Sequence, residues 1–108
     1  MRDFDNFDEP CPPPPIPEGA LVRELAIVNK KGLHARATAK FVQCAERYDA
    51  EITVTRCGET VGGSSIMGLL TLAAAQGTTI TVTARGDQAR EALDALALLV
   101  SDKFGEGE

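Results

Sequence analysis

Apolar positions recur with two different periods in the first half of the chain. The apolar run 25–28 predicts a strand. The polar stretch Asn29–Gly32 that follows it predicts a turn in which Gly32 takes a positive φ. Apolar residues then recur at one-face helical spacing at positions 37, 41, 44, 45 and 48. A helix is therefore predicted to begin just after His34.

The middle of the chain alternates with a period of two. Residues 51–55 and 79–84 place apolar side chains between threonines, which predicts two half-buried strands whose threonines face water. Cys57 and Gly58 lie between two extended runs and predict a hairpin turn, with 59–62 as its short second strand.

Two further helices complete the pattern. One is short and apolar, over 66–72, with Ser64 or Ser65 as its N-cap. The other has Asp87 as its predicted cap and apolar positions at helical spacing at 89, 92, 93, 96, 99, 100 and 104. The order βαββαβα favours an α+β open-faced sandwich, an antiparallel sheet with helices on one face.

Composition limits the chain to one small domain. It has 108 residues, of which 44% are hydrophobic and 25% charged. We expect the domain to span 20–108 and the proline-rich residues 1–19 to form a disordered tail, with a proline-rich ligand for a recognition domain as the alternative. There is neither an apolar run of about 18 residues nor a secretory signal, so we expect a cytoplasmic protein that does not act at a membrane.

Charge and cysteine content exclude other classes. The net charge of -5 has the wrong sign for a protein that binds nucleic acid. The three cysteines are an odd number without a C-x-x-C pair, which argues against a disulfide framework and a zinc site. Cys44 falls on the apolar helix face and is predicted to lie in the core, while Cys11 and Cys57 are predicted to be free thiols.

His34 is the only histidine and lies at a predicted helix N-terminus. The unpaired N–H groups of Ala35 and Arg36 and the helix dipole would converge there, an arrangement that holds phosphate. A neutral imidazole in that field is a candidate phosphoryl acceptor. The alternative is an ordinary surface or core histidine.

Two motifs resemble those of one family. Gly32-Leu33-His34-Ala35-Arg36, followed about thirty residues later by Ser65-Ile66-Met67-Gly68, resembles the HPr family, the histidine-containing phosphocarriers of the bacterial phosphotransferase system. The resemblance spans about 21–104. Ala37 departs from it, because the residue at this position of the family is usually proline. The sequence around Arg36 is more similar to the nitrogen-related branch of the family, called NPr, than to the HPr of sugar transport.

The resemblance implies a fold with four strands and three helices, and a function. His34 would accept a phosphoryl group at Nδ1 from phosphorylated enzyme I and pass it to an EIIA-type protein. Enzyme I would have taken that group from phosphoenolpyruvate. Ala35 and Arg36 would bind the phosphate, without cofactor or metal. Because such a carrier is consumed and regenerated stoichiometrically, it is not an enzyme; we expect a monomer.

The second motif suggests regulation and docking. The resemblance makes Ser65 a candidate for phosphorylation by an HPr kinase/phosphorylase, whereas the alternative is an N-cap alone. Ile66, Met67 and Leu70 would form a docking patch for partners, unless they face the core.

Two other functions compete with the phosphocarrier. One is a regulatory binding protein of the same fold, whose docking patch is switched by phosphorylation. The other is a small hydrolase, which a single histidine leaves without a second catalytic base. The sequence leaves open whether the acceptor serves sugar transport or nitrogen and potassium regulation.

Overall fold

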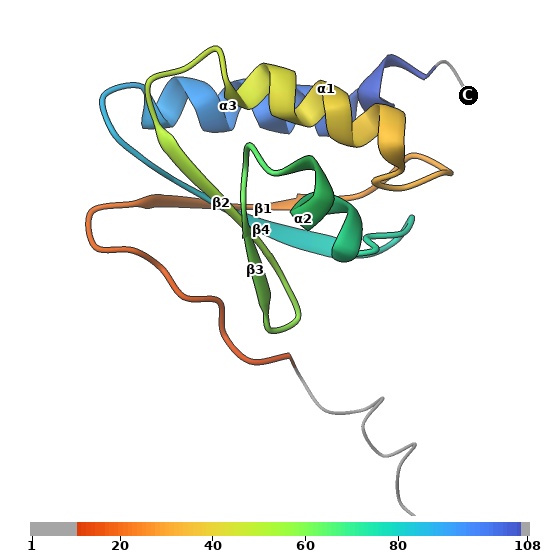
Figure 1. Cartoon of the computed structure of the whole chain (residues 1–108), viewed down its shortest axis with the longest axis horizontal. Coiled ribbons are helices and arrows are strands. Elements are labelled where there is room, and N and C mark those ends of the chain that lie inside the picture. Colours follow the sequence, from red (N-terminus) through yellow and green to blue (C-terminus); the bar gives the residue numbers. More distant parts are fainter. Residues whose placement is uncertain (1–10, 107–108) are drawn as a thin grey trace, which may run out of the picture.

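The computed structural model describes residues 11–106, and four strands in that range form one antiparallel sheet (Figure 1). Their spatial order is β1-β4-β2-β3, so that β4 and β2 are central and β1 and β3 lie at the edges. The strands are β1 (Leu21–Ala26), β2 (Glu51–Arg56), β3 (Glu59–Gly62) and β4 (Thr79–Arg85).

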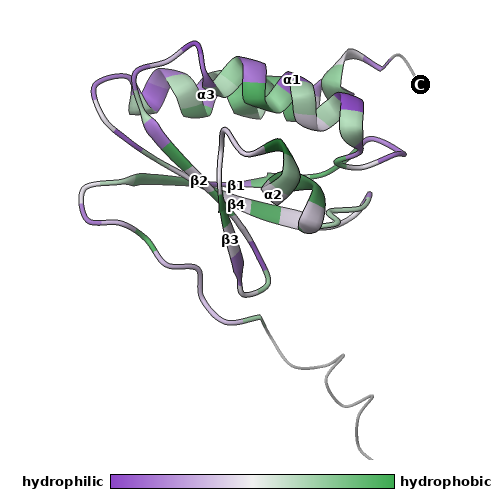
Figure 2. Cartoon of the chain, viewed as in Figure 1, coloured by the Kyte–Doolittle hydropathy of each residue, from purple (hydrophilic) through white to green (hydrophobic). Residues whose placement is uncertain are grey.

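Helices lie on one face of this sheet, which confirms the predicted open-faced sandwich. The three helices are α1 (Ala35–Ala45), α2 (Ile66–Thr71) and α3 (Ala89–Ser101). In Figure 1, α1 and α3 run side by side above the sheet, while the shorter α2 lies below α1 and close to β3. The core is the layer between the helices and the sheet, where Phe41 and Leu96 meet Val54 and Val82. Figure 2 shows the corresponding hydrophobic stripes on helices and strands.

Two glycines have the backbone conformations that the sequence predicts. Gly32 has φ +63°. A side chain there would collide with the carbonyl oxygen of Ala74, so only glycine allows this approach. Cys57 and Gly58 have φ values of 47° and 88° between the paired residues Arg56 and Glu59, as in the two-residue turns that suit hairpins.

The predicted limits of the last helix are wrong at both ends. Its N-cap is Gln88 rather than Asp87, and Gln88 makes no side-chain capping bond. The helix ends at Ser101, because the next turn, Lys103–Gly105, has positive φ throughout. Phe104 is nevertheless buried, as its apolar spacing suggested, but it reaches the core from this turn.

The prediction that the strand threonines face water is wrong for two of them. Thr55 and Thr83 are buried, on the central strands β2 and β4. Their hydroxyls find partners inside the sheet, Thr60 for Thr55 and Thr53 for Thr83. Side-chain pairing of this kind offsets the cost of removing a hydroxyl from water.

The prediction of free thiols at Cys11 and Cys57 is also wrong. The two cysteines form a disulfide with their Cα atoms 4.8 Å apart, which ties residue 11 to the tip of the β2–β3 hairpin. Residues 11–14 line a hollow of about 400 Å³ with Thr55 and Thr79 on the sheet. Part of the predicted tail is thus attached to the domain, whereas residues 1–10 lie outside the described range; the boundary at residue 20 stays a prediction.

The third cysteine lies where the sequence places it. Cys44 is free and buried on the inner side of α1. Burial raises the pKa of its thiol, and the nearby charge of Arg47 partly opposes this. It is therefore a core side chain rather than a reactive thiolate.

Candidate functional site

The N-terminus of α1 has no side-chain cap. His34 is its N-cap residue, with extended backbone, and its carbonyl accepts the first helical bond from the Thr38 N–H at 2.8 Å. Its side chain makes no capping bond. Within the described range the N–H groups of Ala35, Arg36 and Ala37 find no backbone acceptor. These N–H groups and the positive end of the helix dipole are therefore available to an anion.

The segment before His34 is held by the loop that follows α2. The Leu33 N–H donates to the carbonyl of Ala74 at 2.9 Å, and Gly32 passes close to the same carbonyl. Inside α1, the Thr38 hydroxyl donates to the Leu33 carbonyl at 3.3 Å. These contacts fix the position from which the imidazole projects.

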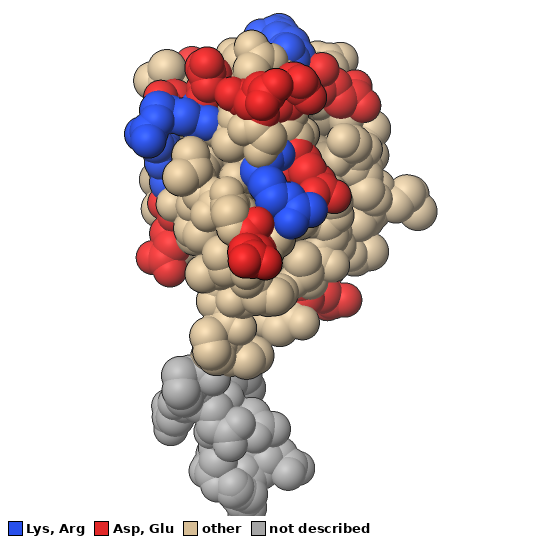
Figure 3. Space-filling model, turned by 90° about the vertical axis from the view of Figure 1, so that its left-hand side faces the viewer, with Lys and Arg blue, Asp and Glu red and all other residues tan. Residues whose placement is uncertain are grey.

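Cations surround the imidazole. A hollow of about 340 Å³ is lined by Lys30, Lys31, His34, Arg36, Lys40, Gly105 and Glu106. The Arg36 side chain is exposed and makes no hydrogen bond or ion pair with any described residue. Among the described residues that line the hollow, four positive side chains and one carboxylate favour an anionic ligand, although the chain as a whole is acidic. On the opposite end of the molecule, acidic and basic side chains are interspersed (Figure 3).

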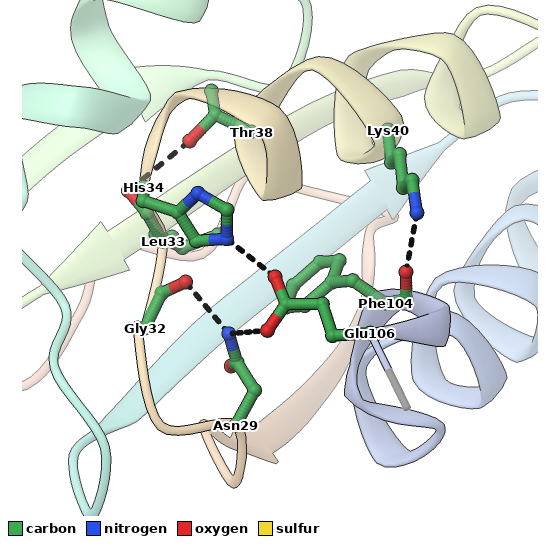
Figure 4. A network of polar contacts seen from close by, with 8 residues as sticks. All are labelled: Asn29, Gly32, Leu33, His34, Thr38, Lys40, Phe104 and Glu106. Carbon is green, nitrogen blue, oxygen red and sulfur yellow. Dashed lines mark hydrogen bonds and ion pairs between the residues drawn. The ribbon is translucent and has the colours of Figure 1, made fainter. Parts of the chain in front are cut away.

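A carboxylate from the C-terminus contacts the imidazole directly. Glu106 Oε2 forms a hydrogen bond and ion pair with Nε2 of His34 (Figure 4). Glu106 Oε1 accepts from Asn29 Nδ2 at 3.1 Å, and the same amide nitrogen donates to the Gly32 carbonyl at 2.9 Å. Residues from both ends of the domain thus meet at His34.

The second motif lies on α2. Ser65 is its N-cap, and its hydroxyl accepts from the Gly68 N–H at 3.0 Å. Ile66 and Met67 are exposed, Met67 at 75%, whereas Leu70 is half-buried. The helix contacts α1, so this apolar surface and the His34 hollow belong to neighbouring elements.

This arrangement can bind a phosphate and present a nitrogen nucleophile to it. No group of three or more potential metal ligands occurs within residues 11–106. None of the described helices is long and apolar enough to cross a membrane. The groups that the structure brings together here are an imidazole, backbone N–H groups and cationic side chains.

Comparison with known proteins identifies the family. The family described as "PTS HPr component phosphorylation site" matches residues 21–102. The chain belongs to the HPr family of phosphocarriers.

The match to individual relatives extends over nearly their full length. The phosphocarrier protein HPr of Cupriavidus necator is 46% identical over 88 residues, which are 82% of this chain and 99% of that protein. The phosphocarrier protein NPr of Shewanella violacea is 44% identical over 86 residues, 80% of this chain and 94% of that protein. The crystal structure of HPr-C-His from Thermoanaerobacter tengcongensis matches with a TM-score of 0.78 and 40% identity, over 82% of this chain and 99% of that one.

Family membership confirms the resemblance seen in the sequence. The relatives are named phosphocarrier proteins, which are carriers within the phosphotransferase system rather than enzymes. The relatives carry both the HPr and the NPr name.

Sequence reasoning missed the residues that complete the site. It placed Ala35 and Arg36 beside His34, as the structure does, but not Glu106, Asn29 or Lys40. Glu106 is 72 positions from His34, and no periodic pattern connects them. The local signal nearest to it is Gly105, a residue suited to the positive φ of the turn that redirects the chain.

Proposed function

We propose that this protein carries a phosphoryl group on His34, received from phosphorylated enzyme I and passed to an EIIA-type protein. The observation that carries the proposal is the position of the only imidazole, at the uncapped N-terminus of α1 and beside the exposed Arg36. Phosphoenolpyruvate is the original phosphoryl source. Each carrier molecule is loaded and unloaded once per cycle.

The transfer needs only one nucleophile on this chain. The lone pair of His34 Nδ1 attacks the donor's phosphorus, a new N–P bond forms, and the donor's bond to phosphorus breaks with its electron pair returning to the donor. The N–H groups of Ala35 and Arg36 and the Arg36 guanidinium offset the charge of the arriving phosphoryl oxygens. In delivery, a histidine nitrogen of the EIIA-type protein attacks the phosphorus, a new N–P bond forms there, and the bond to His34 Nδ1 breaks with its electron pair returning to the ring.

The proposed docking patch for both partners lies on α2 and is formed by the exposed Ile66 and Met67 and the half-buried Leu70. Met67 supports it, because a flexible, polarisable side chain exposed at 75% suits a surface that accepts several partners. Ser65 would be the site at which an HPr kinase/phosphorylase adds a phosphate beside this patch.

The remaining assignments are proposals that the sequence supports. We propose a cytoplasmic monomer of the nitrogen-related branch, which binds neither nucleic acid nor membrane and needs no cofactor. Size-exclusion chromatography with light scattering tests the monomer. The exposed docking patch also favours a second function, regulatory binding in which phosphorylation of His34 switches partner affinity.

Labelling with radioactive phosphoenolpyruvate in the presence of enzyme I tests the acceptor. The wild-type protein should take up label that is lost in hot acid and kept in alkali, as expected for phosphohistidine. His34→Ala should take up none while keeping its circular dichroism, and Cys44→Ser serves as a control that keeps the histidine. Label that persists in His34→Ala contradicts the proposal.

A further inference from the structure

The carboxylate of Glu106 faces one particular nitrogen of the His34 ring. A carboxylate has acceptors only, so the nitrogen bonded to it must carry the proton. In a neutral imidazole that leaves the other nitrogen, Nδ1, with a free lone pair. Figure 4 shows Nδ1 on the side of the ring away from Glu106.

We propose that Glu106 is a positioning residue that keeps His34 protonated at Nε2 and nucleophilic at Nδ1. The role rests on the proposed function of His34 as phosphoryl acceptor. It adds a residue from the other end of the domain, 72 positions away, to the machinery of transfer.

Asn29 fixes the orientation of the carboxylate. Its amide nitrogen donates both to Glu106 Oε1 at 3.1 Å and to the Gly32 carbonyl at 2.9 Å. Turning this amide over would place its oxygen against two acceptors, so the orientation has a single solution. Asn29 is fully buried, and its Oδ1 has no hydrogen-bond partner among the described residues. An amide kept in the interior with one atom unsatisfied is costly, which fits a positioning role better than a packing role.

The backbone that carries Glu106 is also anchored. After α3 the chain reverses through the C-terminal hook, residues 102–106, in which Lys103, Phe104 and Gly105 have positive φ. The Phe104 side chain is inserted into the core at 1% exposure, and Lys40 on α1 donates to the Phe104 carbonyl at 2.7 Å. The hook is therefore hydrogen-bonded to α1, the helix whose N-cap residue is His34.

Glu106 also matches the charge that develops during transfer. As the Nδ1–P bond forms, the Nε2 proton stays on the ring while the ring gains positive charge, which the carboxylate stabilises. The carboxylate of Glu106 also repels an arriving phosphate. The four cationic side chains that line the hollow offset this repulsion. A carboxylate that orients a histidine through its second nitrogen has a known effect in other proteins, where the amide substitution stabilises the wrong tautomer.

The Glu106→Gln variant keeps the shape of the side chain while it removes the charge and changes the hydrogen bonding that selects the His34 tautomer. Because Asn29 donates toward Oε1, it should hold the glutamine oxygen on its own side and turn the NH₂ group toward the imidazole. That NH₂ group donates, so the variant should favour the Nδ1–H tautomer and lose the nucleophile. Glu106→Ala removes both preferences, so its fraction of the Nδ1–H tautomer should lie between those of the wild type and Glu106→Gln.

The first measurement is the ¹⁵N chemical shifts of the His34 ring at a pH where the ring is neutral. The wild type should be mainly the Nε2–H tautomer and Glu106→Gln mainly the Nδ1–H tautomer. The second is the maximal rate of phosphorylation by enzyme I, which should fall by about 10-fold or more in Glu106→Gln with a smaller change in KM. Glu59→Gln, which removes the same charge from an exposed position on β3, should match the wild type in both.

The outcomes distinguish this inference from the proposed function. The tautomer measurement needs no enzyme I, so it stands even if His34 proves not to be phosphorylated. A wild-type tautomer ratio in folded Glu106→Gln overturns the positioning role, as does an unchanged maximal rate. If Glu106→Ala fails to fold, the nearly isosteric Glu106→Gln still decides.

Discussion

Two helices of this protein begin in the same way and treat their N-termini differently. His34 and Ser65 both have extended backbone at the N-cap. The Ser65 hydroxyl accepts from the Gly68 N–H, whereas the His34 side chain caps nothing and bonds to Glu106 instead. One helix satisfies a backbone donor of its own, and the other leaves its donors without a side-chain acceptor. The absence of a local cap is what makes the N-terminus of α1 suited to an anionic ligand.

Their surroundings differ in the same sense. The start of α1 lies among four cations, which compensate an arriving anion. The start of α2 is followed by the exposed apolar residues Ile66 and Met67. The first is suited to chemistry and the second to contact with a partner protein.

Replacing His34, the N-cap residue of α1, should have the largest effect on phosphorylation. His34→Asn removes the nucleophile, so phosphorylation by enzyme I should fall to background. Asparagine is also a good N-cap, so this variant should be about 0.5–1 kcal/mol more stable than His34→Ala in urea unfolding. Equal stability of the two variants would show that the N-terminus of α1 cannot be capped from this position.

Removing the exposed guanidinium should come next. Arg36→Ala should lower kcat/KM for phosphorylation by about 10- to 100-fold, the equivalent of one charge-assisted hydrogen bond of about 1.5–3 kcal/mol. Arg36→Lys should recover part of the loss. Arg47→Ala, an exposed arginine near the other end of α1, is the control and should behave as wild type. A wild-type rate in Arg36→Ala would assign the phosphate to other groups.

Removing the cap of α2 should affect stability rather than transfer. Ser65→Ala loses the bond to the Gly68 N–H and should cost about 1 kcal/mol. For a domain of this size that lowers the melting temperature by roughly 4–8 °C. Ser64→Ala, one residue earlier and exposed, should change it by much less. Maximal transfer rates should be unchanged in both variants; a loss in Ser65→Ala would mean that α2 shapes the acceptor site itself.

A negative charge at Ser65 should have the smallest effect on folding. The dipole favours an anion there by roughly 0.3–1 kcal/mol, so Ser65→Asp should melt at or slightly above the wild-type temperature. A partner bearing phosphohistidine brings negative charge to the adjacent patch, so loading should slow through weaker binding. Added salt should reduce that penalty, and Ser64→Asp should show less of it. Equal rates at low ionic strength and sub-saturating carrier would leave Ser65 as a cap only.

Sequence reasoning succeeded where a feature is local. The positive φ of Gly32, the serine N-cap of α2, which the sequence left between Ser64 and Ser65, and the start of α1 after His34 each depend on neighbours within a few positions. It also gave the order of strands and helices, because periodicity is a local property.

It failed where long-range packing decides. Glu106 reaches His34 only because Phe104 inserts into the core and the turn takes positive φ. Thr55 and Thr83 are buried within the sheet and pair with other threonines, which alternation along one strand cannot reveal. Counting cysteines by parity could not show that Cys11 returns to the hairpin at Cys57.

The bond between these two cysteines changes what a single cut in the backbone does. The positions that it joins are 46 apart, and the closed ring of covalent bonds between them contains β1, α1 and β2. Hydrolysis of one peptide bond in that ring, for example after the exposed Lys30 or Lys31, opens the ring without separating the pieces. Trypsin-nicked protein should therefore run as one species in a denaturing gel and divide into two only after a reducing agent is added.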